Sequence, residues 1–303
     1  MTSILFTVSF YDLCRLLVVI LLWAICYPLI NTGLNSSPPL LFAAMRSVMA
    51  GMTLIVFGLA TGRSFPTGKI IWFILVLVGI FSSTLGFTGM FYAGDKISPG
   101  LATVLSNIQP LIAAIIGYFS LRERLDNQIV FALLLGFIGV NIISFNSIYT
   151  SAGNSTLSGI FYVILGATGV AVGNVLLKRS ALHIDPVMAI GWSFLIGGIV
   201  LLLFSFSAED ASTLVWSLEF LFIFVVLSIF GTAIVYVIWF DLMTRNELNR
   251  LNTFTFLTPV FGLIIAALFY NEHLTLVEWT GTITIMLAAI VAGKASRHRE
   301  LNQ

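Results

Sequence analysis

The chain has 303 residues, of which 59% are hydrophobic and only 9% are charged, and its mean hydropathy is +1.06. Soluble domains carry about 25% charged residues, so most of this protein's surface must face lipid and we expect an integral membrane protein. The net charge of +1 provides no overall field that would attract nucleic acid, and we expect no nucleic-acid partner.

Apolar segments of the length that a bilayer requires follow one another along the whole chain. A membrane-spanning helix needs about 20 mainly apolar residues, and short polar loops separate the segments here. The sequence predicts an all-α integral membrane fold with ten transmembrane helices, at 13–31, 39–61, 70–92, 99–120, 128–146, 157–177, 187–207, 217–240, 250–270 and 276–293.

The basic residues predict the orientation of these spans. The N-terminus and the connections after even-numbered spans hold twelve of the 14 Lys and Arg residues: Arg15, Arg63, Lys69, Arg122, Arg124, Lys178, Arg179, Arg245, Arg250, Lys294, Arg297 and Arg299. The opposite side holds Lys96 alone, and Arg46 lies within a span. Since cytoplasmic loops are enriched in Lys and Arg, we expect both termini in the cytoplasm of a multi-pass protein of the cell membrane, in a bacterium the inner membrane.

The two halves of the chain share a pattern at a constant offset. Pro110 and Pro259 are 149 residues apart, and so are Glu123 and Glu272. Five spans per half give the halves opposite orientations, so the sequence predicts two inverted five-helix repeats, at 1–147 and 155–296, followed by a cytoplasmic tail at 297–303.

These features resemble the drug/metabolite transporter superfamily, specifically its EamA-like ten-span branch. The resemblance rests on Trp23, on Arg46, and on two segments, GFTGMFYAGDKISPGLATVLSNIQPLIAAIIGYFSLRERL in the first half and GTAIVYVIWFDLMTR with FLTPVFGLIIAALFYNEHL in the second. It covers nearly the whole chain. It implies a secondary transporter, often an exporter of amino acids or other small metabolites, with a small-molecule substrate and lipid around it.

Arg46 is the most unusual residue of the predicted spans. It lies about 10 Å along its helix from Pro39, and a charge at that depth in hydrocarbon costs several kcal/mol. One interpretation is that Arg46 faces a central cavity and contacts an anionic group of the substrate. The other is structural: Arg46 binds main-chain carbonyls or extends toward the membrane interface.

Aromatic and amide side chains within the spans form the rest of the candidate substrate site. A cavity for a small metabolite needs apolar walls and a few hydrogen-bonding groups, and polar side chains in spans usually face the bundle interior. Helix packing is the alternative for each residue taken alone. With Arg46, the candidates are Trp23, Tyr27, Tyr92, Asn107, Gln109, Asn174, Tyr236 and Trp239.

The two repeated prolines and glutamates give further expectations. Pro110 and Pro259 interrupt the hydrogen bonds of their helices, so each is a candidate hinge or a fixed kink. Glu123 ends its span where the helix dipole disfavours a carboxylate, and we expect a cationic partner such as Arg122 or Arg124. The alternative for the glutamates is a role in proton coupling.

The remaining motifs argue against other function classes. Cys14 and Cys26 would be about 18 Å apart on one helix, too far for a disulfide. No H-E-x-x-H or G-x-S-x-G motif is present, so we expect no metal, no cofactor and no intramembrane enzyme.

An exchanger of sugar phosphates or nucleotides, or a carrier of lipid-linked substrates, is the transport alternative. Gly169 and Gly173 fit packing within a monomer or a homodimer contact.

Overall fold

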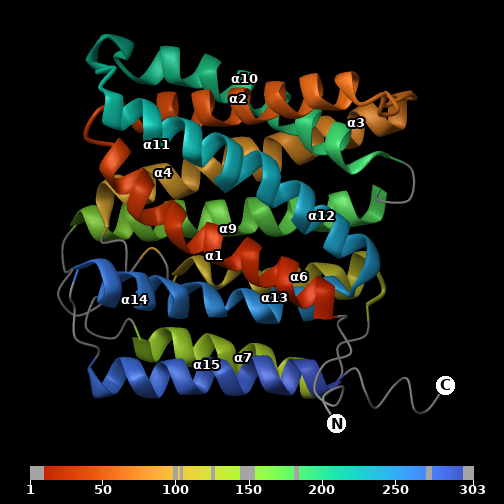
Figure 1. Ribbon diagram of the computed structural model, residues 1–303, viewed down its shortest axis with the longest axis vertical. Coiled ribbons are helices and arrows are strands. Elements are labelled where there is room, and N and C mark those ends of the chain that lie inside the picture. The colour runs from red at the N-terminus through yellow and green to blue at the C-terminus, as the bar shows by residue number, and fades with distance from the viewer. Residues whose placement is uncertain are drawn as a thin grey trace.

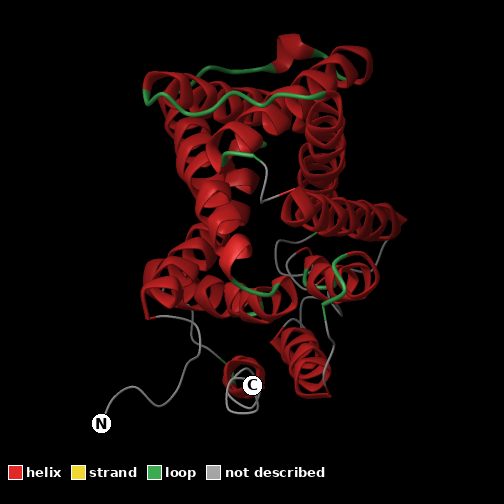
Figure 2. Cartoon of the chain, turned by 90° about the vertical axis from the view of Figure 1, so that its right-hand side faces the viewer, coloured by secondary structure: helices red, strands yellow, loops and turns green. Residues whose placement is uncertain are grey.

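The computed structural model describes residues 10–97, 102, 105–123, 127–143, 154–180, 184–270 and 275–295. Within these residues every regular secondary-structure element is a helix, which agrees with the predicted all-α class. Figure 1 shows most helices running side by side across the molecule, and several appear nearly end-on in Figure 2. This is the arrangement of a helical bundle.

The helical elements follow one another with short connections. They are α1 (Phe10–Gly33), α2 (Pro39–Ala60), α3 (Lys69–Val78), η1 (Gly79–Leu85), α4 (Gly86–Lys96), α6 (Gln109–Ser120), α7 (Asn127–Ile143), α9 (Asn154–Ser180), α10 (Pro186–Ala208), η2 (Ala211–Thr213), α11 (Leu218–Ser228), η3 (Ile229–Ile234), α12 (Val235–Arg245), α13 (Leu248–Thr255), α14 (Leu257–Tyr270) and α15 (Leu276–Ala295).

Six helical stretches are long and apolar enough to cross a bilayer: Tyr11–Gly33, Pro39–Ala60, Lys69–Lys96, Leu157–Arg179, Pro186–Ala208 and Leu218–Arg245. Three further apolar helices, Gln109–Ser120, Asn127–Ile143 and Trp279–Ala292, have 10–17 residues. The protein therefore has the helices of a multi-pass membrane protein, and the count of ten spans stays a prediction.

Two predicted spans are interrupted rather than continuous. Turns at Asn107 and Ile108 precede α6, and a turn at Phe256 separates α13 from α14. In each case a proline follows within three residues, Pro110 in the first turn of α6 and Pro259 in the first turn of α14. Proline lacks the N–H that would continue the ladder and clashes with the preceding turn, so each span consists of two helical pieces.

Two other spans each contain a π-helical turn. η1 lies between α3 and α4, and η3 lies between α11 and α12. Phe81 in η1 and Phe230 in η3 are 149 residues apart, the same offset that relates the two prolines. π-Helical turns are rare in proteins, and those that occur are often found at functional sites. Each half of the chain therefore has one such turn, at matching positions in the sequence.

The main helix contacts join the first half of the chain to the second. α2 lies along α10 and α7 lies along α15, as Figure 1 shows at its upper and lower edges. α9 packs against α4 and α6, while α1 packs against α12 and α14. The two halves therefore share one interior and do not form separate bodies.

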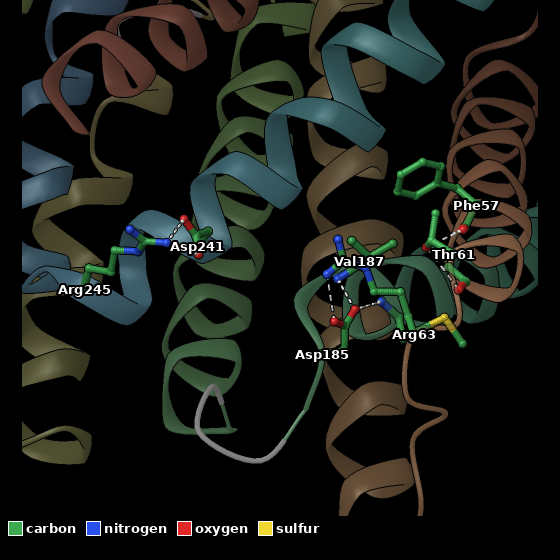
Figure 3. Close-up of polar contacts among 9 residues, drawn as sticks. Phe57, Thr61, Arg63, Asp185, Val187, Asp241 and Arg245 are labelled. Carbon is green, nitrogen blue, oxygen red and sulfur yellow. Dashed lines mark hydrogen bonds and ion pairs between the residues drawn. The ribbon is translucent and has the colours of Figure 1, made fainter. Parts of the chain in front are cut away.

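The ends of α2 and α10 are held by reciprocal polar contacts. At one end the Glu209 carboxylate accepts hydrogen bonds from the N–H groups of Leu40 and Leu41, both at 2.9 Å. At the other end Asp185 caps α10 and pairs with Arg63 at 3.0 Å, as seen in Figure 3. A carboxylate at a helix N-terminus accepts hydrogen bonds from N–H groups that have no partner within the helix. These contacts therefore stabilise the first turns of α2 and α10.

Glycines allow the closest contacts of the bundle. A Cβ on Gly51 of α2 would lie 2.5 Å from the main-chain nitrogen of Leu195. Gly169 and Gly173 of α9 lie against η1, where a Cβ on Gly169 would lie 2.5 Å from Phe81 O. These two glycines are therefore used in packing within the bundle.

We predict that Gly51→Ala lowers the thermal unfolding midpoint in detergent, because its methyl group would separate α2 from α10. Overpacking of this kind costs about 1–3 kcal/mol. The control is Gly262→Ala in α14, where an added Cβ meets no atom within 4 Å. Midpoints that fall equally for both variants would contradict the prediction.

Candidate functional site

A cavity lies in the middle of the bundle, between helices of both halves. Residues of α1, α2, α4, α9 and α12 line it, together with residues next to the two helix breaks, namely Ser106, Asn107 and Gln109 on one side and Thr255 and Thr258 on the other. The cavity has a volume of about 150 Å³. On the same measure, one water molecule needs roughly 10–15 Å³. The cavity therefore has room for a small metabolite.

Arg46 lies on the wall of this cavity and is 2% exposed. Its Nε donates a hydrogen bond to Thr232 Oγ1 at 2.7 Å, and its Nη2 donates to the carbonyl oxygen of Gly231 at 3.1 Å. Both acceptors belong to η3, and Thr232 Oγ1 itself donates to Leu227 O, five residues earlier. The π-helical turn thus supplies the acceptors that hold the guanidinium.

The rest of the guanidinium contacts an aromatic ring or has no hydrogen-bond partner. Its central carbon lies 4.8 Å from the centroid of the Phe87 ring, a cation–π distance. Nη1 has no hydrogen-bond partner, although almost none of its surface is exposed. The main-chain carbonyl contact expected from the structural interpretation is present, and Nη1 is left without an acceptor.

Cys26 adjoins this group and was not among the predicted site residues. Arg46 Nη2 lies 3.7 Å from its sulfur, and the thiol contacts the carbonyl oxygen of Leu22 at 3.3 Å. Phe87 and Met90 of α4 also line the cavity and were not predicted. As apolar residues in apolar spans, they give no sequence signal that separates them from lipid-facing neighbours.

Most of the predicted site residues come together at the cavity or directly behind it. Trp23, Asn107, Gln109 and Tyr236 line the cavity. Trp239 packs on Trp23, with ring centroids 5.1 Å apart.

Two further candidates do not line the cavity. The Asn174 amide oxygen accepts a hydrogen bond from Trp239 Nε1 at 3.3 Å, so Asn174 supports the aromatic wall from behind. Tyr92 packs on Tyr162, with ring centroids 4.9 Å apart, near the end of α4. The Tyr27 side chain lies outside the described part of the structure, as do Arg124 and Glu272.

Thr255 and Thr258 also line the cavity and were not among the predicted site residues. They are 149 residues after Ser106 and Gln109, and all four line the cavity. The offset shared by the two prolines would have found both threonines, because it relates positions beside the two helix breaks.

Among the described residues, Glu123 has a cationic partner that the sequence did not predict, while Arg124, one of its two expected partners, lies outside them. Its carboxylate pairs with Lys178 of α9 at 2.5 Å and accepts hydrogen bonds from the N–H groups of Leu248 and Asn249 at 2.9 and 3.1 Å. Arg122, the other expected partner, is exposed and has a left-handed main-chain conformation, with φ of 54°. The carboxylate therefore caps the N-terminus of α13, where the helix dipole favours a negative charge.

These contacts belong to a larger polar cluster at one end of the bundle, which we call the charged end. Lys178 Nζ also donates to Asn246 O at 2.6 Å. Asp241 of α12 pairs with Arg15 of α1 at 2.6 Å and with Arg245 at 3.1 Å, the latter visible in Figure 3. The charged end ties α1 to α12, and the segment after α6 to α9 and α13.

Metal coordination is not indicated by the described residues, in which no group of three or more His, Cys, Asp or Glu side chains lies close enough to hold an ion.

Comparison with known proteins shows the family. The sequence profile of the EamA-like transporter family matches residues 12–145 and, a second time, residues 157–293. This chain belongs to the EamA-like transporter family. It is a multi-pass membrane protein, and its relatives are transporters of the drug/metabolite type.

Named relatives agree with this family. A WAT1-related chloroplast protein of Arabidopsis thaliana is 30% identical over 278 residues, which are 88% of this chain and 65% of the plant protein. This chain therefore spans just under two thirds of that relative. A probable amino-acid metabolite efflux pump of Escherichia coli K12 is 28% identical over 89% of this chain and 90% of its own length.

A solved crystal structure shares the fold, with a TM-score of 0.79. It is 21% identical in sequence and matches 96% of this chain and 99% of its own. At that identity the similarity bears on the fold and not on the substrate.

We predict that Thr232→Val lowers the thermal unfolding midpoint, because it leaves Arg46 Nε in a buried site without an acceptor. Such a loss costs about 1–3 kcal/mol, and valine keeps the shape of threonine. Thr244→Val is the matched control, since this exposed threonine bonds only to Asp241 O in its own helix. A shift no larger than that of the control would show that the Thr232 contact is dispensable.

Proposed function

We propose that this protein is a secondary transporter that moves a small metabolite through the central cavity by alternating access, and that it exports amino acids or related compounds. The family and the cavity between the two halves support this proposal. The amino-acid part rests on the name of the E. coli relative, a probable amino-acid metabolite efflux pump.

The proposed architecture is ten spans in two inverted five-helix repeats, at 1–147 and 155–296. Paired irregularities support it, since η1 and η3 lie at equivalent positions. Reciprocal packing also supports it, because α9 contacts α4 and α6 while α1 contacts α12 and α14. Inverted halves around a site near the midplane are typical of secondary transporters, and we propose cytoplasmic termini on the basis of the basic residues.

The unpartnered Nη1 of Arg46 carries the proposal for the substrate site. An intramembrane ionisable residue usually marks a substrate or ion pathway, and Nη1 can donate to a carboxylate while Nε and Nη2 keep their contacts with η3. We therefore assign anion recognition to Arg46. Trp23, Tyr236, Asn107 and Gln109 provide apolar contact and hydrogen bonds, and Trp239 and Asn174 support Trp23.

The residues that line the cavity favour a carboxylate substrate over a sugar phosphate or nucleotide. Among the described residues that line the cavity, Arg46 is the only charged one. A sugar phosphate or nucleotide carries two or more negative charges, and its transfer from water would need more cationic partners than one guanidinium. A substrate with one carboxylate fits this wall better.

The transport test uses purified protein in liposomes loaded with amino acids, other monocarboxylates or sugar phosphates. We expect efflux of a carboxylate substrate, and a decrease of at least tenfold for Arg46→Gln. Arg46→Lys should retain more activity than Arg46→Gln because it keeps the charge. Arg179→Gln, at an exposed position near the end of α9, is the control for loss of a positive charge.

Normal efflux of the carboxylate by Arg46→Gln would overturn the assignment of Arg46. Efflux restricted to sugar phosphates would overturn the substrate class. Unfolding midpoints of all variants are measured alongside, so that a decrease caused by lost protein is recognised.

A further inference from the structure

Polar residues form a row in the sequence between the charged end and the cavity. Asn249, Asn252, Thr255 and Thr258 follow one another at every third residue along α13 and the start of α14. Side chains three residues apart are neighbours on a helix. Thr255 and Thr258 line the cavity, and the N–H of Asn249 bonds to Glu123 in the charged end.

The two asparagines of this row are buried without hydrogen-bond partners. Asn249 is 1% exposed and Asn252 is 0% exposed, and neither the oxygen nor the nitrogen of either amide has a partner. A buried polar group without a partner destabilises the folded state, and native proteins have few of them. Four such atoms on neighbouring turns indicate side chains that are satisfied in another conformation.

The charged end closes the row in the conformation described here. Glu123 is 9% exposed and holds both Lys178 and the first N–H groups of α13. Lys178 in turn holds Asn246 O, at 2.6 Å. We call the contacts of Glu123 with Lys178 and α13 the clasp. Separation of Glu123 from Lys178 and α13 would uncover Asn249 first and Asn252 next.

The first half of the chain also has polar residues beside its helix break. Ser106 and Gln109, 149 residues before Thr255 and Thr258, also line the cavity beside a helix break. Under the inverted-repeat proposal, each interrupted span would lead from the cavity to one side of the membrane. The row along α13 would then lead from the cavity to the side of the membrane where the charged end lies.

We propose that Asn249 and Asn252 form a second polar subsite for the substrate, on the route between the cavity and the charged end, which opens when the clasp separates. This inference rests on the proposed transport function. An amide presents a donor and an acceptor without a charge, so the subsite suits the carboxylate, amine or hydroxyl group of a small metabolite and the water that accompanies it. Such a subsite would bind weakly and let the substrate pass.

The test measures the reaction of a single introduced cysteine with a hydrophilic methanethiosulfonate reagent. The protein carries Cys14→Ser and Cys26→Ala and is held in lipid nanodiscs, in which both membrane faces are accessible. We expect Asn252→Cys to react slowly with the clasp intact and at least tenfold faster when Lys178→Ala is added. Glu123→Gln, which weakens the same clasp, should have the same effect.

Thr253→Cys is the matched control. Thr253 is equally buried and adjacent in sequence, but its hydroxyl donates to Asn249 O within the helix and lies outside the row. An unchanged rate for Asn252→Cys in both clasp variants would overturn the route. An equal increase for Thr253→Cys would also overturn it, because that result shows general loosening of α13.

A transport measurement separates this inference from the proposed function. Asn252→Val should lower efflux at least fivefold at an unchanged unfolding midpoint, while Thr253→Val should not. If Asn252→Val transports normally and the cysteine stays unreactive, the second subsite is wrong while the transporter and its Arg46 site stand. If no efflux occurs in the unaltered protein, the proposed function is wrong, whatever the labelling shows.

Discussion

The buried guanidinium of Arg46 is the constraint on which the central cavity depends. Its charge would cost several kcal/mol in hydrocarbon, and the oxygen acceptors of its Nε and Nη2 both belong to η3. The guanidinium therefore holds α2 to the π-helical turn of another span, and the ring of Phe87 covers its face. The same arrangement leaves Nη1 without an acceptor, so one side chain both supports the packing and supplies the cation of the proposed substrate site.

The π-helical turns of the two halves of the chain share the 149-residue offset but are packed in different ways. η1 and η3 lie at matching positions, but η1 meets α10 through the close approach of Gly79 and Gly197, whereas η3 meets α2 through the Arg46 side chain. A contact between glycines is tight and apolar, and a long charged side chain keeps its helices further apart. Arg46 lies on the wall of the cavity and is the one charged residue among the described residues that line it.

Sequence reasoning found the residues whose chemistry is unusual in an apolar span. Trp23, Arg46, Asn107, Gln109 and Tyr236 line the cavity, which agrees with the tendency of polar side chains in spans to face the bundle interior. Apolar members of the wall were missed because they resemble lipid-facing residues. Glu123 was assigned to neighbours in sequence, and its partner Lys178 comes from a distant helix.

The sequence by itself determined the membrane class, the depth of Arg46 in its helix, and the offset that relates the two halves. These properties are local, because hydropathy, proline and charge act within one or two turns of a helix. Only the tertiary structure decided that η3 holds Arg46, that Lys178 and the start of α13 hold Glu123, and that Asn249 and Asn252 are buried together. Those contacts depend on how each helix is rotated against its neighbours, which long-range packing sets.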